Sequence, residues 1–170
     1  MNAVSEVKLA TTALKVSFVV RPIENVVCDL SGILANYTEG LLRAFYPKIV
    51  AKRANILITE LVNNVLENIM DPESEFAVDV SIDGAALVIK VNNRVAPERY
   101  EKVKNHVDKI NDSGGPKRLL KQVVRERRRN RTVGGLGLIR VAAENKFRLS
   151  TSYREGTLCV ESVLDLGGLP

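Results

Sequence analysis

Cysteine, aromatic residues and long apolar runs are all scarce in this sequence. Only two cysteines, Cys28 and Cys159, occur in 170 residues, and both stand among apolar neighbours. They predict reduced core residues, not a disulfide framework, and their separation fits no metal-ligand spacing. No apolar run approaches the roughly 20 residues of a membrane span. The first residues lack the basic and apolar regions of a secretion signal, so we expect a cytoplasmic protein with no membrane association.

Net positive charge is confined to one segment of the chain. Residues 112–133 contain eight basic and two acidic residues, a net charge of +6, whereas the whole chain carries +5. The rest of the chain is therefore close to neutral, unlike the broadly basic surface of many nucleic-acid binders. The basic segment is either a lid, whose arginines neutralise a triphosphate or meet an acidic partner, or a solvated helix. Few aromatic rings for stacking stand near it, so we rank a nucleic-acid function last.

The remaining pattern is that of one domain over residues 13–170, after an unpatterned and flexible stretch over 1–12. The sequence predicts strands at 13–20, 76–82, 86–91, 147–153 and 157–166. It predicts helices at 24–45, 47–70, 97–110, 117–129 and 138–145. Turn residues between the paired strands predict two hairpins. We therefore expect an α+β fold, a two-layer α/β sandwich with helices on one face of a mixed, mostly antiparallel sheet.

One predicted helix carries an unusual polar stripe. Residues 60, 64 and 67 fall on one face, flanked by Asn63 and Asn68. A solvated amphipathic face is the alternative explanation. Three asparagines within six residues are poor helix formers, however, and a solvated face would more naturally use Lys, Gln or Arg. Short amides beside carboxylates favour the wall of a site, because an Asn oxygen can bind magnesium and a Glu can take a proton.

A glycine-rich loop, Gly134-Gly135-Leu136-Gly137, directly precedes a predicted helix. Glycines let backbone N–H groups approach phosphates, and a helix N-terminus favours negative charge. The spacing matches neither the Rossmann fingerprint nor the P-loop. Taken alone, the motif is equally consistent with a plain flexible turn.

Together these motifs resemble the histidine-kinase-like ATPase (GHKL, or Bergerat) superfamily. Glu60-Leu-Val-Asn-Asn64 is similar to its N box, Gly135-Leu-Gly137-Leu138 to its second glycine box, and Gly156-Thr157 to the Gly-Thr pair on its late hairpin. The layout resembles the small bacterial anti-sigma-factor serine kinases and the SiaB-type protein kinases. The resemblance covers about residues 50–166.

The resemblance implies ATP and Mg²⁺ binding. Glu60 would be the general base and Asn64 the metal ligand, while Gly134, Gly135 and Gly137 would surround the phosphates. Such a protein would be a serine/threonine kinase in a bacterial partner-switching or signalling pathway. Its partner would be a small regulatory protein such as an anti-sigma-factor antagonist, and a homodimer is left open.

The adenine end departs from the family pattern. Thr157 would lie near the base, but Asn92-Asn93-Arg94 stands where the superfamily usually has Asp-x-Gly. The oxygen of Asn92 can still accept a hydrogen bond from the adenine amine, without the strength of a charged acceptor. The alternative function is therefore a degenerate, non-catalytic regulator that sequesters a partner. His106, the only histidine, lies in a polar helix and is interpreted as a surface residue, which excludes a conventional sensor histidine kinase.

Overall fold

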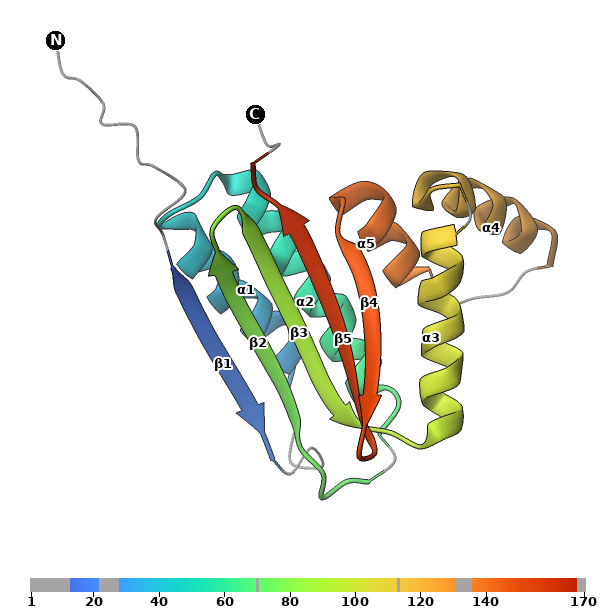
Figure 1. Ribbon diagram of the computed structural model, residues 1–170, viewed down its shortest axis with the longest axis horizontal. Helices are drawn as coiled ribbons and strands as arrows, with labels where there is room; N and C mark the ends of the chain where they lie inside the picture. The colour runs from blue at the N-terminus through green and yellow to red at the C-terminus, as the bar shows by residue number, and fades with distance from the viewer. Residues whose placement is uncertain (1–12, 22–27, 70, 113, 131–135, 168–170) are drawn as a thin grey trace, which may run out of the picture.

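A computed structural model describes residues 13–21, 28–69, 71–112, 114–130 and 136–167, with the backbone alone at 127–130. The predicted flexible stretch at 1–12 lies outside these residues. The described chain has an α+β fold with one five-stranded sheet and five helices (Figure 1). Each predicted element has a counterpart. The helix expected from residue 24 begins at Leu30, and residues 22–27 lie outside the described part of the chain.

The strands lie in the order β1-β2-β3-β5-β4 across the sheet. Their bounds are β1 Leu14–Val20, β2 Phe76–Asp83, β3 Ala86–Arg94, β4 Arg148–Arg154 and β5 Thr157–Asp165. All four pairings within the described residues are antiparallel. The expectation of a mixed sheet is therefore wrong here. The physical reason is that hairpins β2–β3 and β4–β5 are antiparallel and lie side by side, with β3 pairing antiparallel with β5 and β4 at the edge of the sheet.

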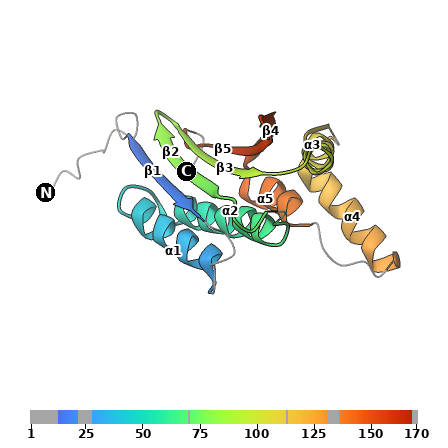
Figure 2. The ribbon, with the colours of Figure 1, turned by 90° about the horizontal axis from the view of Figure 1, so that it is seen from below.

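The helices form the second layer. Their bounds are α1 Leu30–Arg43, α2 Lys48–Leu66, α3 Pro97–Asp112, α4 Pro116–Asn130 and α5 Gly137–Asn145. Figure 2 shows α1, α2 and α5 against one face of the sheet, with α3 and α4 beyond the β4 edge. This is the two-layer arrangement that the sequence predicts.

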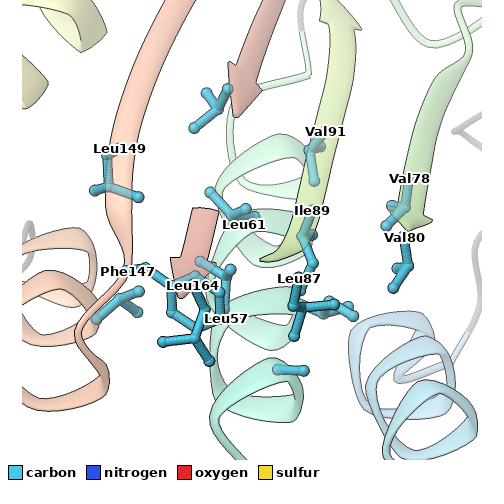
Figure 3. Packing of buried hydrophobic residues seen from close by; sticks show 14 of the residues in the cluster. Leu57, Leu61, Val78, Val80, Leu87, Ile89, Val91, Phe147, Leu149 and Leu164 are labelled. Atoms are coloured by element: carbon cyan, nitrogen blue, oxygen red, sulfur yellow. The ribbon is translucent and has the colours of Figure 1, made fainter. Parts of the chain in front are cut away.

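Alternating side chains build the core between the layers. In β2 and β5 every second residue is buried, and the intervening ones are not. Leu57 and Leu61 of α2 belong to the same buried cluster as Leu87, Ile89 and Val91 of β3 (Figure 3). This packing fixes α2 beneath the middle strand of the sheet, which sets the position of its polar stripe.

The opposite face of the sheet is polar. Lys90 and Glu161, on neighbouring strands, form an ion pair of 2.7 Å, which raises the pKa of Lys90. Cys159 lies on this face half-buried, and burial raises the pKa of its thiol. Cys28 is exposed just before α1. The expectation that both cysteines belong to the core is therefore wrong; for Cys159 the reason is that its apolar neighbours Leu158 and Val160 point to the other face of β5.

Three element boundaries differ from the prediction in ways that affect the site. Strand β3 continues three residues further, to Arg94, because it pairs with β5 as far as Thr157. Helix α2 stops at Leu66, four residues early. Helix α3 runs on to Asp112. No helix in the described part of the chain is both long and apolar enough to cross a membrane.

The described part of the basic segment is a packed helix. Leu119, Leu120 and Val123 of α4 lie against the core, and α4 makes most of its contacts with α5. Its charged side chains point outward, including Lys117, Lys121 and Arg125. Within residues 116–130 the predicted lid is therefore an amphipathic helix with one apolar face.

Candidate functional site

A cavity of about 280 Å³ lies where the C-terminal half of α2, the first half of α3 and the start of α5 meet the sheet. This volume is close to the lower end of the roughly 300–1,000 Å³ typical of ligand pockets. Its walls differ in chemistry: α2 supplies a polar wall, α3 a basic one and the sheet an apolar one.

The polar wall consists of Glu60, Asn64 and Asn68, the stripe that the sequence predicts. The Asn64 side-chain amide donates to Oε1 of Glu60 across 3.3 Å, one helical turn away. The Asn68 amide donates to the backbone carbonyl of Asn64 across 2.8 Å, which satisfies a carbonyl at the end of the helix. The three side chains therefore form a connected row along the cavity, and none is fully solvated.

Gly137, the first residue of α5, closes the cavity against this wall. A Cβ atom at position 137 would overlap the carboxylate of Glu60. No side chain caps the N-terminus of α5, and a carboxylate placed there interacts favourably with the helix dipole. Two motifs that are far apart in the chain thus meet in direct contact.

The basic wall is one face of α3. Arg99, Lys102 and His106 follow one another at helical spacing and line the cavity, with Arg99 and His106 half-buried. Glu60 is the one carboxylate among the described lining residues. The cavity therefore carries a net positive charge, which suits a ligand with negative charge.

Aromatic contacts hold α3 in place beside the sheet. Tyr100 stacks on Tyr153 of β4 with ring centroids 4.8 Å apart. The Tyr153 hydroxyl donates to the carbonyl of Val95 across 2.9 Å, just before α3 begins. At the other end, the Asn111 amide donates to the carbonyl of Leu149 on the edge strand. These contacts determine which face of α3 lines the cavity.

The apolar wall comes from β3 and β5. It contains four branched side chains, with one amide at its edge: Val91, Val95, Leu158, Val160 and Asn93. The side-chain amide of Asn93 donates to the carbonyl of Arg94. A flat aromatic ligand would find an apolar surface and one polar anchor here.

The structure does not bring every predicted residue to this cavity. Glu60, Asn64 and Gly137 line it. Asn92 lies on the opposite face of β3, where its amide donates to Asp79 across 3.3 Å. Thr157 also alternates away from the cavity, because its neighbour Leu158 faces inward. Gly134 and Gly135 lie outside the described residues.

The prediction also missed residues that line the cavity. Asn93 takes the place expected for Asn92, because β3 continues and the alternation that buries Val91 brings Asn93 to the same face. His106 was expected on the surface, but it is half-buried in the wall. The helical spacing of Arg99, Lys102 and His106 was visible in the sequence. It did not show that this face meets the polar stripe of α2.

The side chains of the cavity suit a metal ion that is held mainly by a bound nucleotide or similar ligand, with few contacts to the protein itself. Among the described residues, no group of three or more His, Cys, Asp or Glu side chains could hold a metal alone. Magnesium in nucleotide sites usually takes one or two protein ligands, several waters and phosphate oxygens. Asn64 can supply one such oxygen, since its bond to Glu60 uses the nitrogen of the amide.

Comparison with known proteins adds no assignment. No protein-family model matches the sequence, and no curated protein matches it significantly.

Proposed function

We propose that this protein binds ATP with Mg²⁺ in the cavity between α2, α3, α5 and the sheet, as a Bergerat-type member of the histidine-kinase-like ATPases. The meeting of Glu60, Asn64 and Gly137 in one cavity carries the proposal. The first two belong to the stretch that resembles the N box, and the third to the one that resembles the second glycine box. Their contact across the fold supports a common site.

The adenine base fits the apolar end of the cavity. Val91 and Val160 offer the surface for the ring, and Asn93 offers an oxygen for the amine. This assigns to Asn93 the role that the resemblance implies for Asn92. An amide acceptor is weaker than a carboxylate, so we expect modest affinity.

The phosphates fit the opposite end. The first N–H groups of α5 lie beside Gly137, where an anion is favoured. Arg99 and Lys102 on the facing wall supply fixed positive charge. Asn64 would supply one oxygen to the magnesium ion, which neutralises the phosphates when it is bound. Glu60 and Asn64 stay within hydrogen-bond reach of each other, so the base and the metal ligand act at one place.

The proposed activity is transfer of the γ-phosphoryl group to a serine or threonine hydroxyl of a small partner protein in a bacterial partner-switching pathway. The bond between the β- and γ-phosphates breaks, a phosphoester forms and ADP leaves. Glu60 would take the proton of the hydroxyl, as a positioned carboxylate does in other phosphoryl transfers.

A non-catalytic regulator is the second candidate. One observation favours it: Asn92 is bound to Asp79 on the other face of the sheet. The cavity thus lacks a carboxylate for the adenine amine among its described residues. Such a protein would bind its partner and hold it without phosphorylating it.

Calorimetric titration with ATP and Mg²⁺ tests the binding site. Asn64→Ala should weaken binding at least about tenfold, in line with the loss of a charge-assisted contact. Asn63→Ala is the matched control, because Asn63 is the adjacent amide on α2 and does not line the cavity. Equal effects of both substitutions, or no binding by the wild-type protein, would contradict the proposed site.

Incubation with labelled ATP and candidate antagonist domains separates the two functions. Glu60→Gln should abolish phosphoryl transfer. Glu67→Gln is the control and should leave transfer unchanged, because Glu67 is an exposed carboxylate at the end of the same helix and does not line the cavity. ATP binding without transfer to any candidate domain favours the regulator.

A further inference from the structure

We propose a second binding site, for an acidic segment of a partner protein, in a groove between α4 and the junction of α5 with β4. The groove has a volume of about 670 Å³. Five basic side chains surround it, and we call it the basic groove: Lys117, Arg118, Lys121, Lys146 and Arg148. It shares no lining residue with the nucleotide cavity.

The charge of the basic groove is uncompensated. None of its five bases forms an ion pair with any residue that the structure describes. No Asp or Glu occurs among the described residues of its lining. The cations come from two separate pieces of chain, namely the first turns of α4 and the short link from α5 into β4. Like charges gathered without counter-charges repel one another, so an anionic occupant lowers the energy of this surface.

The floor of the basic groove is apolar. Ala142, Ala143 and Phe147 line its base, but all three are buried, so little apolar surface is open to an occupant. A peptide segment with several carboxylates matches the basic rim, because opposite charges meet there.

A nucleic acid fits the basic groove less well. Phe147 is 3% exposed and offers no face for a base to stack on. The excess charge of the chain is also confined to one segment and does not follow a long track. Duplex binding typically needs many phosphate contacts along such a track. These two observations favour an acidic peptide over DNA or RNA.

Fluorescence anisotropy on the full-length protein tests the inference. The probe is a labelled peptide of about twelve residues, made of Asp and Glu with two central leucines, at about 50 mM salt, where charge pairs are weakly screened. The variant Lys117→Glu/Lys121→Glu reverses two charges in the first turns of α4. We expect its affinity for the probe to fall about tenfold or more.

The chain offers a closely matched control. Lys48→Glu/Lys52→Glu changes the same residue type at the same spacing in the first turns of α2, and both lysines are exposed there. We expect less than about a twofold change, since only long-range charge differs. Circular dichroism checks the fold of both variants. If the groove variant does not fold, Lys121→Gln replaces it and should weaken binding about threefold.

Three results would overturn the proposal. One is an equal loss of affinity in both charge-reversal variants, which means unspecific attraction. Another is displacement of the probe by duplex DNA at equal charge concentration, which assigns the surface to nucleic acid. The third is displacement by inorganic phosphate, which reduces the surface to a simple anion site. Asn64→Ala should leave peptide binding unchanged, so failure of the nucleotide site and failure of the basic groove are distinguishable.

Discussion

The Cα atom of Gly137 faces the carboxylate of Glu60 so closely that position 137 has no room for a methyl group. The two residues belong to α5 and α2, which are separated in the chain by two strands and two helices. This contact fixes the start of α5 relative to the polar wall of the cavity. Both the packing of α5 and the geometry of the proposed phosphate end depend on it.

Gly137→Ala should therefore destabilise the protein and weaken ATP binding. The added methyl group must displace the carboxylate or shift α5, and overpacking of this kind costs about 1–3 kcal/mol. Chemical denaturation measures the stability. Gly40→Ala is the control, because Gly40 lies inside α1 with open space around it. That substitution should stabilise the protein by up to about 1 kcal/mol.

The double variant Glu60→Ala/Gly137→Ala tests whether the cost of Gly137→Ala comes from a steric conflict between the new methyl group and the Glu60 carboxylate. Removal of the carboxylate makes room for the methyl group, so the two substitutions should be non-additive, with a coupling of about 1 kcal/mol or more. Strict additivity would show that the two residues are not in contact.

A second prediction concerns the N-cap of α1. Oδ1 of Asp29 accepts hydrogen bonds from the Gly32 N–H and the Ser31 hydroxyl, both at 2.8 Å. These bonds, with the Gly32 bond the larger cause, lower the pKa of Asp29 below its ordinary value of 3.8. A carboxyl group with a lowered pKa in the folded state stabilises the fold above its unfolded pKa and loses that effect as the pH falls through the folded one.

Asp29→Ala should consequently destabilise the protein at neutral pH and have a shrinking effect as the pH falls below 3.8. Thermal unfolding of both proteins over this range measures the difference, and carbon NMR of the Asp29 carboxyl measures the pKa directly. Ser31→Ala should move that pKa back toward 3.8. A pKa that stays unchanged in Ser31→Ala would contradict the hydroxyl as a cause.

The two cysteines should differ in reactivity. Cys28 is exposed, whereas Cys159 is half-buried and burial raises the pKa of its thiol, which leaves less of the reactive thiolate at neutral pH. We expect a thiol reagent such as iodoacetamide to label Cys28 first, followed by mass spectrometry of the digested protein. Cys159 should react at a comparable rate only after unfolding. Equal rates in the folded protein would contradict the burial of Cys159.

Much of the fold could be predicted because its signals are local. Apolar alternation marks β2 and β5, and the turn before Ala86 marks a hairpin with Gly84 at a positive φ of 59°. The end of β3 could not be predicted, because asparagine is disfavoured in strands and only the pairings with β2 and β5 continue the strand beyond Val91. The resemblance to Asp-x-Gly placed Asn92 in the site, whereas the alternation along the extended strand brings Asn93 to the cavity.

The cavity could be predicted only in part, for a similar reason. The stripe around Glu60 and Asn64 is visible in one helix, so the sequence contains it. The basic face of α3 is equally regular in the sequence, but whether it lines the cavity depends on where α3 packs beside the sheet. The stacking of Tyr100 on Tyr153 decides that, and it joins residues that no short-range pattern connects.

The position of the three later helices has a consequence for how the protein folds. Hairpins β2–β3 and β4–β5 close through two-residue turns, whereas β3 pairs with β5 only after the chain from Val95 to Phe147 has been brought back. Closing so long a loop costs entropy before its contacts form, which makes such pairings late and slow. Both proposed sites draw walls from this interposed stretch. The nucleotide cavity also needs walls from α2, β3 and β5, so it is completed only when the two halves of the sheet join, whereas the basic groove is lined by residues 114–148 alone. A chain stalled before that step therefore lacks the nucleotide cavity.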